Sequence, residues 1–76
     1  MTSQIRASPY QTDEVHYEMT DGQRIPNTIE FRGYDYYLTS IWSCEDEARI
    51  EAMRARRDGD RATVKRNGVW WVLYLR

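Results

Sequence analysis

Aromatic and basic side chains alternate near the end of this sequence in a pattern that could bind a ligand. Trp70 and Tyr74 are four residues apart in the segment 69–75, and Arg61 and Lys65 are four residues apart in the segment before it. If the two segments are paired strands, these four side chains lie on the same face. Rings can stack on nucleobases or sugars while cations meet phosphates. Aromatic residues and arginine also make up protein-interface hot spots. Together with Tyr37, these residues form the predicted aromatic and basic binding set.

Groups that could do catalysis are few. His16 has no cysteine or serine nucleophile near it, and its position in an alternating segment indicates a surface histidine. Cys44 begins a predicted helix, but the acidic residues that follow it oppose a thiolate. Those carboxylates lack the spacing and central glycine of a calcium loop, and the glycines are isolated at turns. We expect no enzyme activity, no metal and no cofactor.

Charge is distributed unevenly, although the formal net charge is -1. Residues 1–48 carry 3 basic and 9 acidic side chains (3 − 9 = −6), and residues 49–76 carry 8 and 3 (8 − 3 = +5). This asymmetry indicates a partner with complementary patches, although acids at the start of a helix and bases at its end give the same pattern. The acidic candidates are Asp13, Glu14, Asp21, Asp35, Glu45 and Glu47.

Two turns organise the first half. The segment from Val15 alternates like a half-buried strand, and a three-residue loop at 20–22 with a left-handed Gly22 aligns it with the segment around Ile25. A second turn at residues 32–33 pairs Phe31 with Tyr34. One face of these strands then carries Ile25, Ile29, Phe31, Tyr34, Tyr36, Leu38 and Trp42, and the other carries Glu30, Asp35, Tyr37, Thr39 and Ile41.

A helix and a hairpin follow. Ser43 is the predicted N-cap of a helix over residues 44–57, and Gly59 is its stop signal. Small residues form a stripe along this helix, whereas Ile50 and Met53 fall on another side; either the helix tilts to bury both sets, or the second side meets a partner. The pair Asn67-Gly68 predicts a tight turn between the segments 61–66 and 69–75.

The predicted fold class is α+β, with order β-β-β-α-β-β. Residues 1–12 are expected to form a flexible arm, and residues 13–76 a single two-layer domain. In that domain one helix packs on one face of an antiparallel sheet of about five strands. The other face is then open and presents the aromatic and basic set, unless the sheet curls or the protein dimerises and the rings are core.

Length and composition limit the classes of protein. A chain of 76 residues makes one domain at most, and with one cysteine it forms no intramolecular disulfide. The longest apolar run is far shorter than the roughly 20 residues of a membrane helix, and no signal peptide opens the chain. We expect a cytoplasmic protein that does not associate with membranes.

The stretch from Tyr36 to Leu75 has a predicted strand, a Ser-Cys-Glu-Asp-Glu-Ala helix start, an Asp-Gly pair and a hairpin. In this order of elements it resembles half of the sporulation-related peptidoglycan-binding repeat. That family places a second helix after the final hairpin strand, and this sequence stops at Arg76. The resemblance assigns no residue role and no function.

The sequence therefore predicts a non-enzymatic module that docks on a protein partner. One form of this prediction is a phage or mobile-element inhibitor of a host nucleic-acid-handling complex, with the acidic residues competing with nucleic acid. The alternative is direct binding of single-stranded nucleic acid or of a glycan by the aromatic and basic set. A homodimer through Trp70 or through Ile50 and Met53 is a third hypothesis.

Overall fold

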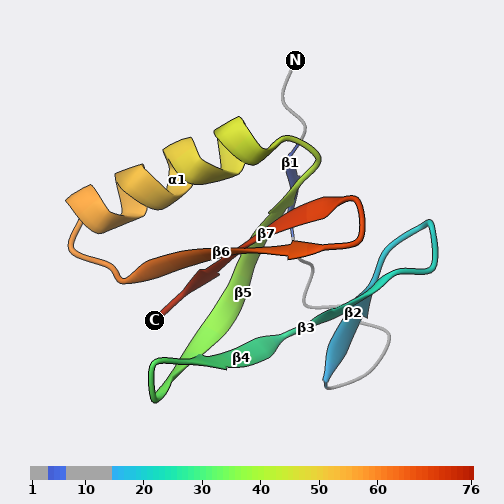
Figure 1. The fold of residues 1–76 in the computed structure, drawn as a ribbon, viewed down its shortest axis with the longest axis horizontal. Helices are drawn as coiled ribbons and strands as arrows, with labels where there is room; N and C mark the ends of the chain where they lie inside the picture. The colour runs from blue at the N-terminus through green and yellow to red at the C-terminus, as the bar shows by residue number, and fades with distance from the viewer. Residues whose placement is uncertain (1–3, 7–14) are drawn as a thin grey trace.

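The computed structural model describes residues 15–76 and the backbone of residues 4–6. Figure 1 shows the helix α1 lying alongside β6 and β7 of the main sheet. The elements in chain order are β1 (Gln4–Arg6), β2 (His16–Glu18), β3 (Arg24–Pro26), β4 (Thr28–Phe31), β5 (Tyr34–Trp42), α1 (Glu45–Arg57), β6 (Ala62–Asn67) and β7 (Trp70–Leu75).

The strand β5 is the centre of the main sheet. The sheet has five antiparallel strands in the order β1-β5-β7-β6, and β4 also pairs with β5. Since β7 occupies one edge of β5, β4 and β1 follow one another along the other edge. The predicted arm 1–12 is described only at Gln4–Arg6, where the backbone pairs with Ser40–Trp42. The rest of the arm lies outside the described residues.

The α+β class, the antiparallel sheet and its single packed helix are confirmed for the described part of the chain. The prediction of one sheet in two layers is wrong. β2 and β3 form a separate two-stranded sheet. Met19, which follows β2, and Ile25 on β3 are buried in one core cluster with Ile41, Val72 and Tyr74 of the main sheet. The hairpin thus covers part of the face opposite the helix and adds a third layer.

Both turns predicted in the first half are confirmed. Tyr17 pairs with Ile25 across a three-residue loop, Gly22 has φ +88°, and the Met19 amide donates to the Gln23 carbonyl at 2.8 Å. The loop length places Tyr17 and Ile25 on the same face as predicted. Phe31 pairs with Tyr34 across the two-residue turn at 32–33.

The predicted faces of β5 are wrong beyond Leu38. The register of β5 against β7 shifts between Leu38 and Ser40, so one extra residue lies in β5 there. A bulge of this kind reverses the alternation of the residues that follow it. Ile41 consequently joins the core beside Tyr36, and Trp42 moves to the helix face.

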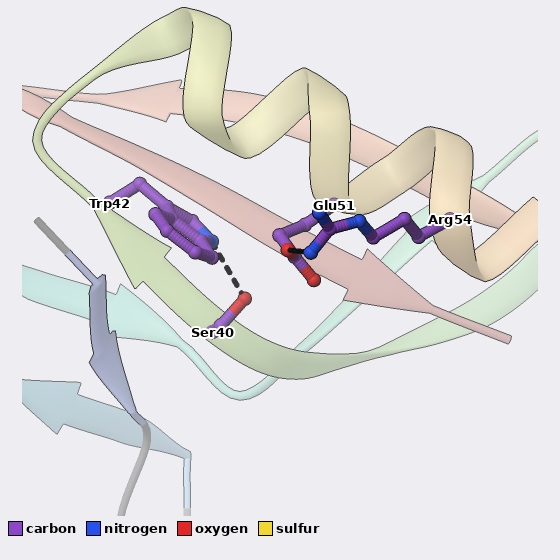
Figure 2. Close-up of polar contacts among 4 residues, drawn as sticks. All are labelled: Ser40, Trp42, Glu51 and Arg54. Atoms are coloured by element: carbon purple, nitrogen blue, oxygen red, sulfur yellow. Dashed lines mark hydrogen bonds and ion pairs between the residues drawn. The ribbon is translucent and has the colours of Figure 1, made fainter. Parts of the chain in front are cut away.

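The helix face of the sheet is packed by small residues. Ala48 is fully buried and Ala52 is 1% exposed, which matches the predicted small-residue stripe. Figure 2 shows the Trp42 indole directed at the Ser40 hydroxyl, to which its Nε1 donates at 2.8 Å. Ile50 remains 50% exposed and Met53 55% exposed, so the helix does not bury both sets.

The two ends of α1 differ in how well they were predicted. Cys44, not Ser43, is the N-cap, and no side chain caps the helix start. At the other end Gly59 has φ +97°, its amide donates to the Arg56 carbonyl at 3.1 Å, and the Asp60 amide donates to the Ala55 carbonyl at 2.9 Å. This is the glycine-dependent C-terminal motif that the sequence predicts.

The turn between β6 and β7 lies one residue later than predicted. Asn67 pairs with Trp70, so the central residues are Gly68 and Val69. Gly68 has φ +63° and Val69 does not have a positive φ, which is the type II′ pattern for a glycine in first position. The predicted turn would pair Arg66 with Val69, whereas Arg66 pairs with Trp71. Because Arg66 thus moves by two residues along β7, the predicted faces are preserved. The Asn67 side-chain Oδ1 instead accepts a hydrogen bond from the side-chain Nε2 of Gln23.

Candidate functional site

The β2–β3 hairpin closes one end of the sheet face that was expected to be open. Tyr74 is only 1% exposed, and its hydroxyl donates to the Pro26 carbonyl at 2.7 Å. Burial of this ring raises the pKa of Tyr74 to about 12. Trp70 is half-buried, and its Nε1 donates to the Asp21 carboxylate at 3.0 Å. Tyr74 therefore belongs to the core, as in the curled-sheet alternative, and its ring has no open face for a ligand.

Tyr37 lies apart from these residues. It is 57% exposed and pairs with Leu75, on the face of the sheet that carries Leu73 and the helix. The predicted aromatic and basic set is thus not brought together on one surface.

The other end of the same face is open and forms a basic hollow, which we call the arginine groove. Its volume is about 470 Å³. It is lined by residues from β4 and the turn after it, β5, the end of α1 with the loop after it, β6 and the residue after β7: Phe31, Arg32, Tyr34, Tyr36, Arg56, Asp60, Arg61, Ala62, Thr63 and Arg76. Arg61 is the one member of the predicted set that lines it.

Curling of the sheet creates this groove. Lys65 on β6 has its Nζ 4.5 Å from the centre of the Phe31 ring on β4, although β5 and β7 lie between these strands in the sheet order. Flat strands are about 4.8 Å apart, so this contact requires the sheet to bend. β4 and β6 do not pair with each other. A seam therefore remains between them, crossed by Lys65.

Cations already cover the rings of the groove. The Arg76 guanidinium carbon is 3.4 Å from the centre of the Tyr34 ring, and that of Arg32 is 5.2 Å from the Phe31 ring. The Phe31 ring also meets Tyr36 edge to face, with centroids 5.7 Å apart. Stacking on a ring restricts a guanidinium while leaving its N–H groups able to bind an anion.

The groove carries a strong excess of positive charge. Four arginines line it together with one acidic residue, Asp60, and Lys65 stands beside it. Arg56 also donates from Nη2 to the Ala62 carbonyl at 2.9 Å, which holds its side chain against β6. Guanidinium groups are chemically suited to pair with carboxylate or phosphate oxygens.

The predicted acidic residues do not form one surface. Asp13 and Glu14 lie outside the described residues, and Asp21 bonds Trp70 at a loop tip. Asp35 pairs in register with Glu30 near the start of β5.

Glu45 and Glu47 begin α1, beyond the other end of β5, and Glu45 forms an ion pair with Arg49 at 2.8 Å. β5 runs from Tyr34 to Trp42, so roughly 23 Å of strand lies between Asp35 and the end of β5 from which the chain leads to these two acids.

The other chemical candidates are dispersed. His16 pairs in register with Pro26, and Cys44 is a half-buried free thiol. Within residues 15–76, no three histidine, cysteine or acidic side chains are grouped as metal ligands. Over the same residues, no helix is long and apolar enough to cross a membrane.

Sequence reasoning missed most of the groove. It placed Phe31 and Tyr34 with the core strands, read Arg56 as part of the basic last turn of the helix, and gave no binding role to Arg32 or Arg56. The available signal was the cluster of bases around 54–66, but their meeting with the turn at 32–33 depends on sheet curvature. Comparison of the chain with protein-family models, curated proteins and solved structures finds no match.

Proposed function

We propose that this protein is a non-enzymatic binding module that docks on an acidic segment of a protein partner through the arginine groove. The observation that carries the proposal is the convergence of Arg32, Arg56, Arg61 and Arg76 from separate segments around aromatic side chains. Arginine and tyrosine are the residue types that dominate protein-interface hot spots.

The partly covered rings favour a protein over a single-stranded nucleic acid or a glycan. Those ligands need ring faces on which bases or sugars can stack. In the groove, two cations lie over the Phe31 ring, Arg76 lies over one face of the Tyr34 ring, which stays 51% exposed, and Tyr74 is buried in the core. Carboxylates need only the outward N–H groups of the guanidinium ions. The positive charge alone would also attract phosphates, so nucleic acid remains the second candidate.

An inhibitory role, as expected for a phage or mobile-element protein, is a finer form of this proposal. A small module that occupies an acidic surface blocks other ligands of that surface. The separation of Asp35 from Glu45 and Glu47 gives no support to mimicry of nucleic acid by an acidic face.

The test compares a short glutamate-rich peptide with a single-stranded oligonucleotide of equal charge, each titrated against the full chain. Arg61→Glu should weaken peptide binding by about tenfold or more, because it removes a charge-assisted contact and adds repulsion. Arg57→Glu is the matched control, since Arg57 is exposed near the end of α1 and does not line the groove. It should change affinity by less than about threefold.

Two results would contradict the proposal. Equal losses for Arg61→Glu and Arg57→Glu would show that overall charge, and not the groove, attracts the peptide. Tighter binding of the oligonucleotide, with a steep loss of affinity at higher salt, would move nucleic acid to first place.

A further inference from the structure

The strand β6 has an unpaired edge in the described structure. It ends the strand order β1-β5-β7-β6. The Arg76 amide donates to the Arg61 carbonyl at 2.9 Å, which makes these two residues a hydrogen-bonded pair. By alternation, Thr63, Lys65 and Asn67 also direct their backbone groups to β7.

The remaining residues of β6 direct their backbone groups outward. They are Ala62, Val64 and Arg66. The Ala62 carbonyl accepts its bond from Arg56. Within the described part of the chain, the outward amides and carbonyls of Val64 and Arg66 have no hydrogen bond. Two residues of β6 are thus available for pairing with another strand.

This edge lies between two hollows that share Arg56, and the second also has Arg49, which is ion-paired with Glu45. The arginine groove is on one side. On the other side, between α1 and β6, is a hollow of about 210 Å³ lined by Arg49, Ala52, Met53, Arg56 and Val64. Successive side chains of a strand point to opposite faces, so a strand added to β6 would direct alternate residues into the two hollows.

We propose that an extended acidic segment of the partner binds as an added strand on β6. Its backbone pairs with Val64 and Arg66. Its alternate acidic side chains meet Arg61 and Lys65 on one side, and the arginines of the helix hollow on the other. This inference rests on the proposed function, because the same segment fills the arginine groove.

Charge identifies the occupant as an acidic segment and not a second copy of this chain. Pairing β6 with β6 of another copy would bring two sets of Arg61, Lys65 and Arg66 together. Like charges across neighbouring strands are destabilising, and basic residues on an edge are a common barrier to self-pairing. An acidic strand converts the same residues into attractive contacts.

Amide hydrogen exchange of the full chain tests this geometry, with the glutamate-rich peptide carrying interspersed valines as the probe. In the free protein the amides of Val64 and Arg66 should exchange rapidly, and those of Thr63 and Lys65 slowly. With the peptide bound, Val64 and Arg66 should slow by about tenfold or more. Thr63 and Lys65 serve as internal controls because they are already bonded to β7.

Two matched pairs separate backbone pairing from charge attraction. The same peptide methylated at alternate backbone amides keeps its charge and should bind about tenfold more weakly. Arg66→Pro should bind the unmodified peptide about tenfold more weakly than Arg66→Ala. Both variants lose the side chain, and only proline removes the outward N–H. Circular dichroism checks that both variants are folded.

The outcomes distinguish this inference from the function on which it rests. Peptide binding that depends on Arg61, with unprotected Val64 and Arg66 amides and equal affinity for the methylated peptide, would overturn strand addition and leave docking in the groove intact. Failure of the peptide to bind would overturn both. A doubled mass, with Val64 and Arg66 protected without peptide, would show that a second copy occupies the edge and would overturn the inference.

Discussion

The two ends of one sheet face differ in what covers their aromatic rings. At the closed end, Tyr74 lies beneath the β2–β3 hairpin and is packed by Met19 and Ile25. At the open end, cations lie over the Phe31 ring and over one face of the Tyr34 ring, and Tyr34 stays 51% exposed. The comparison teaches that alternating aromatic residues become core or accessible surface according to whether a second layer reaches them.

The length of the hairpin explains why it covers one end. β2 and β3 each have 3 residues, so each extends about 10 Å. β5 has 9 residues and extends roughly three times as far. Long side chains with charged heads lie over part of the remaining ring surface, since their stems pack on apolar surface while the heads stay in water.

The largest effect should come from opening the closed end. Ile25→Ala removes a fully buried side chain between the two sheets. We expect a loss of about 2–5 kcal/mol in the free energy of unfolding, measured with urea. Val15→Ala is the control, because Val15 is 60% exposed, and should cost less than about 0.5 kcal/mol. Similar losses for the two variants would show that the hairpin is not part of the core.

Ionisation of Tyr74 should weaken the same end at high pH. Its pKa is raised by burial from the ordinary 10.0 to about 12, so the unfolded chain releases the phenolic proton first as the pH rises. The stability that depends on a protonated Tyr74 is fully present below pH 10 and is lost between pH 10 and 12. The free energy of unfolding should fall by roughly 2–3 kcal/mol over this range.

Tyr74→Phe is the control for this titration. Urea unfolding across the same pH range should show a smaller decline for the variant than for the natural chain, since phenylalanine has no proton to release. Parallel declines would contradict the buried position of the phenol.

A smaller effect is expected at the edge of the hairpin. Asp21→Ala removes the acceptor for the Trp70 indole N–H and for the backbone N–H of Gln23. Because Asp21 is exposed, we expect a loss of about 1 kcal/mol. The Trp70 indole N–H signal in a nuclear magnetic resonance spectrum should shift and exchange faster. An unchanged indole signal would show that the loop tip does not hold Trp70.

The smallest effect on stability should come from the open end. Arg76→Ala uncovers the Tyr34 ring without leaving a buried cavity, since both residues are exposed. We expect a change within about 0.5 kcal/mol in the free energy of unfolding. A loss above roughly 1.5 kcal/mol would mean that Arg76 packs as part of the core. The open end would then be stabilised in the same way as the closed end.

Local rules predicted the parts of the fold that depend on neighbouring residues. The left-handed Gly22 fixed the loop and register of the first hairpin, and Gly59 ended the helix. The bulge in β5 is not marked in the sequence by a glycine or another turn residue. Because of this bulge, Ile41 and Trp42 lie on the faces opposite to those predicted.

The site was less predictable because it depends on how distant elements meet. The contact of Lys65 with Phe31 arises from sheet curvature, which the alternation of side chains does not encode. The residues of the predicted aromatic and basic set therefore lie in different places. Tyr74 is in the core, Tyr37 is on the helix face, and only Arg61 of this set lines the groove.

Mapping the backbone amide signals of the full chain during titration with the glutamate-rich peptide tests the central claim most directly. We predict that the perturbed signals concentrate at the open end, around Arg61, Lys65 and Arg76, while Met19 and Ile25 of the closed end keep their positions. Perturbation centred on the β2–β3 hairpin, or no perturbation at the open end, would contradict the division of this face into a core end and a proposed docking end.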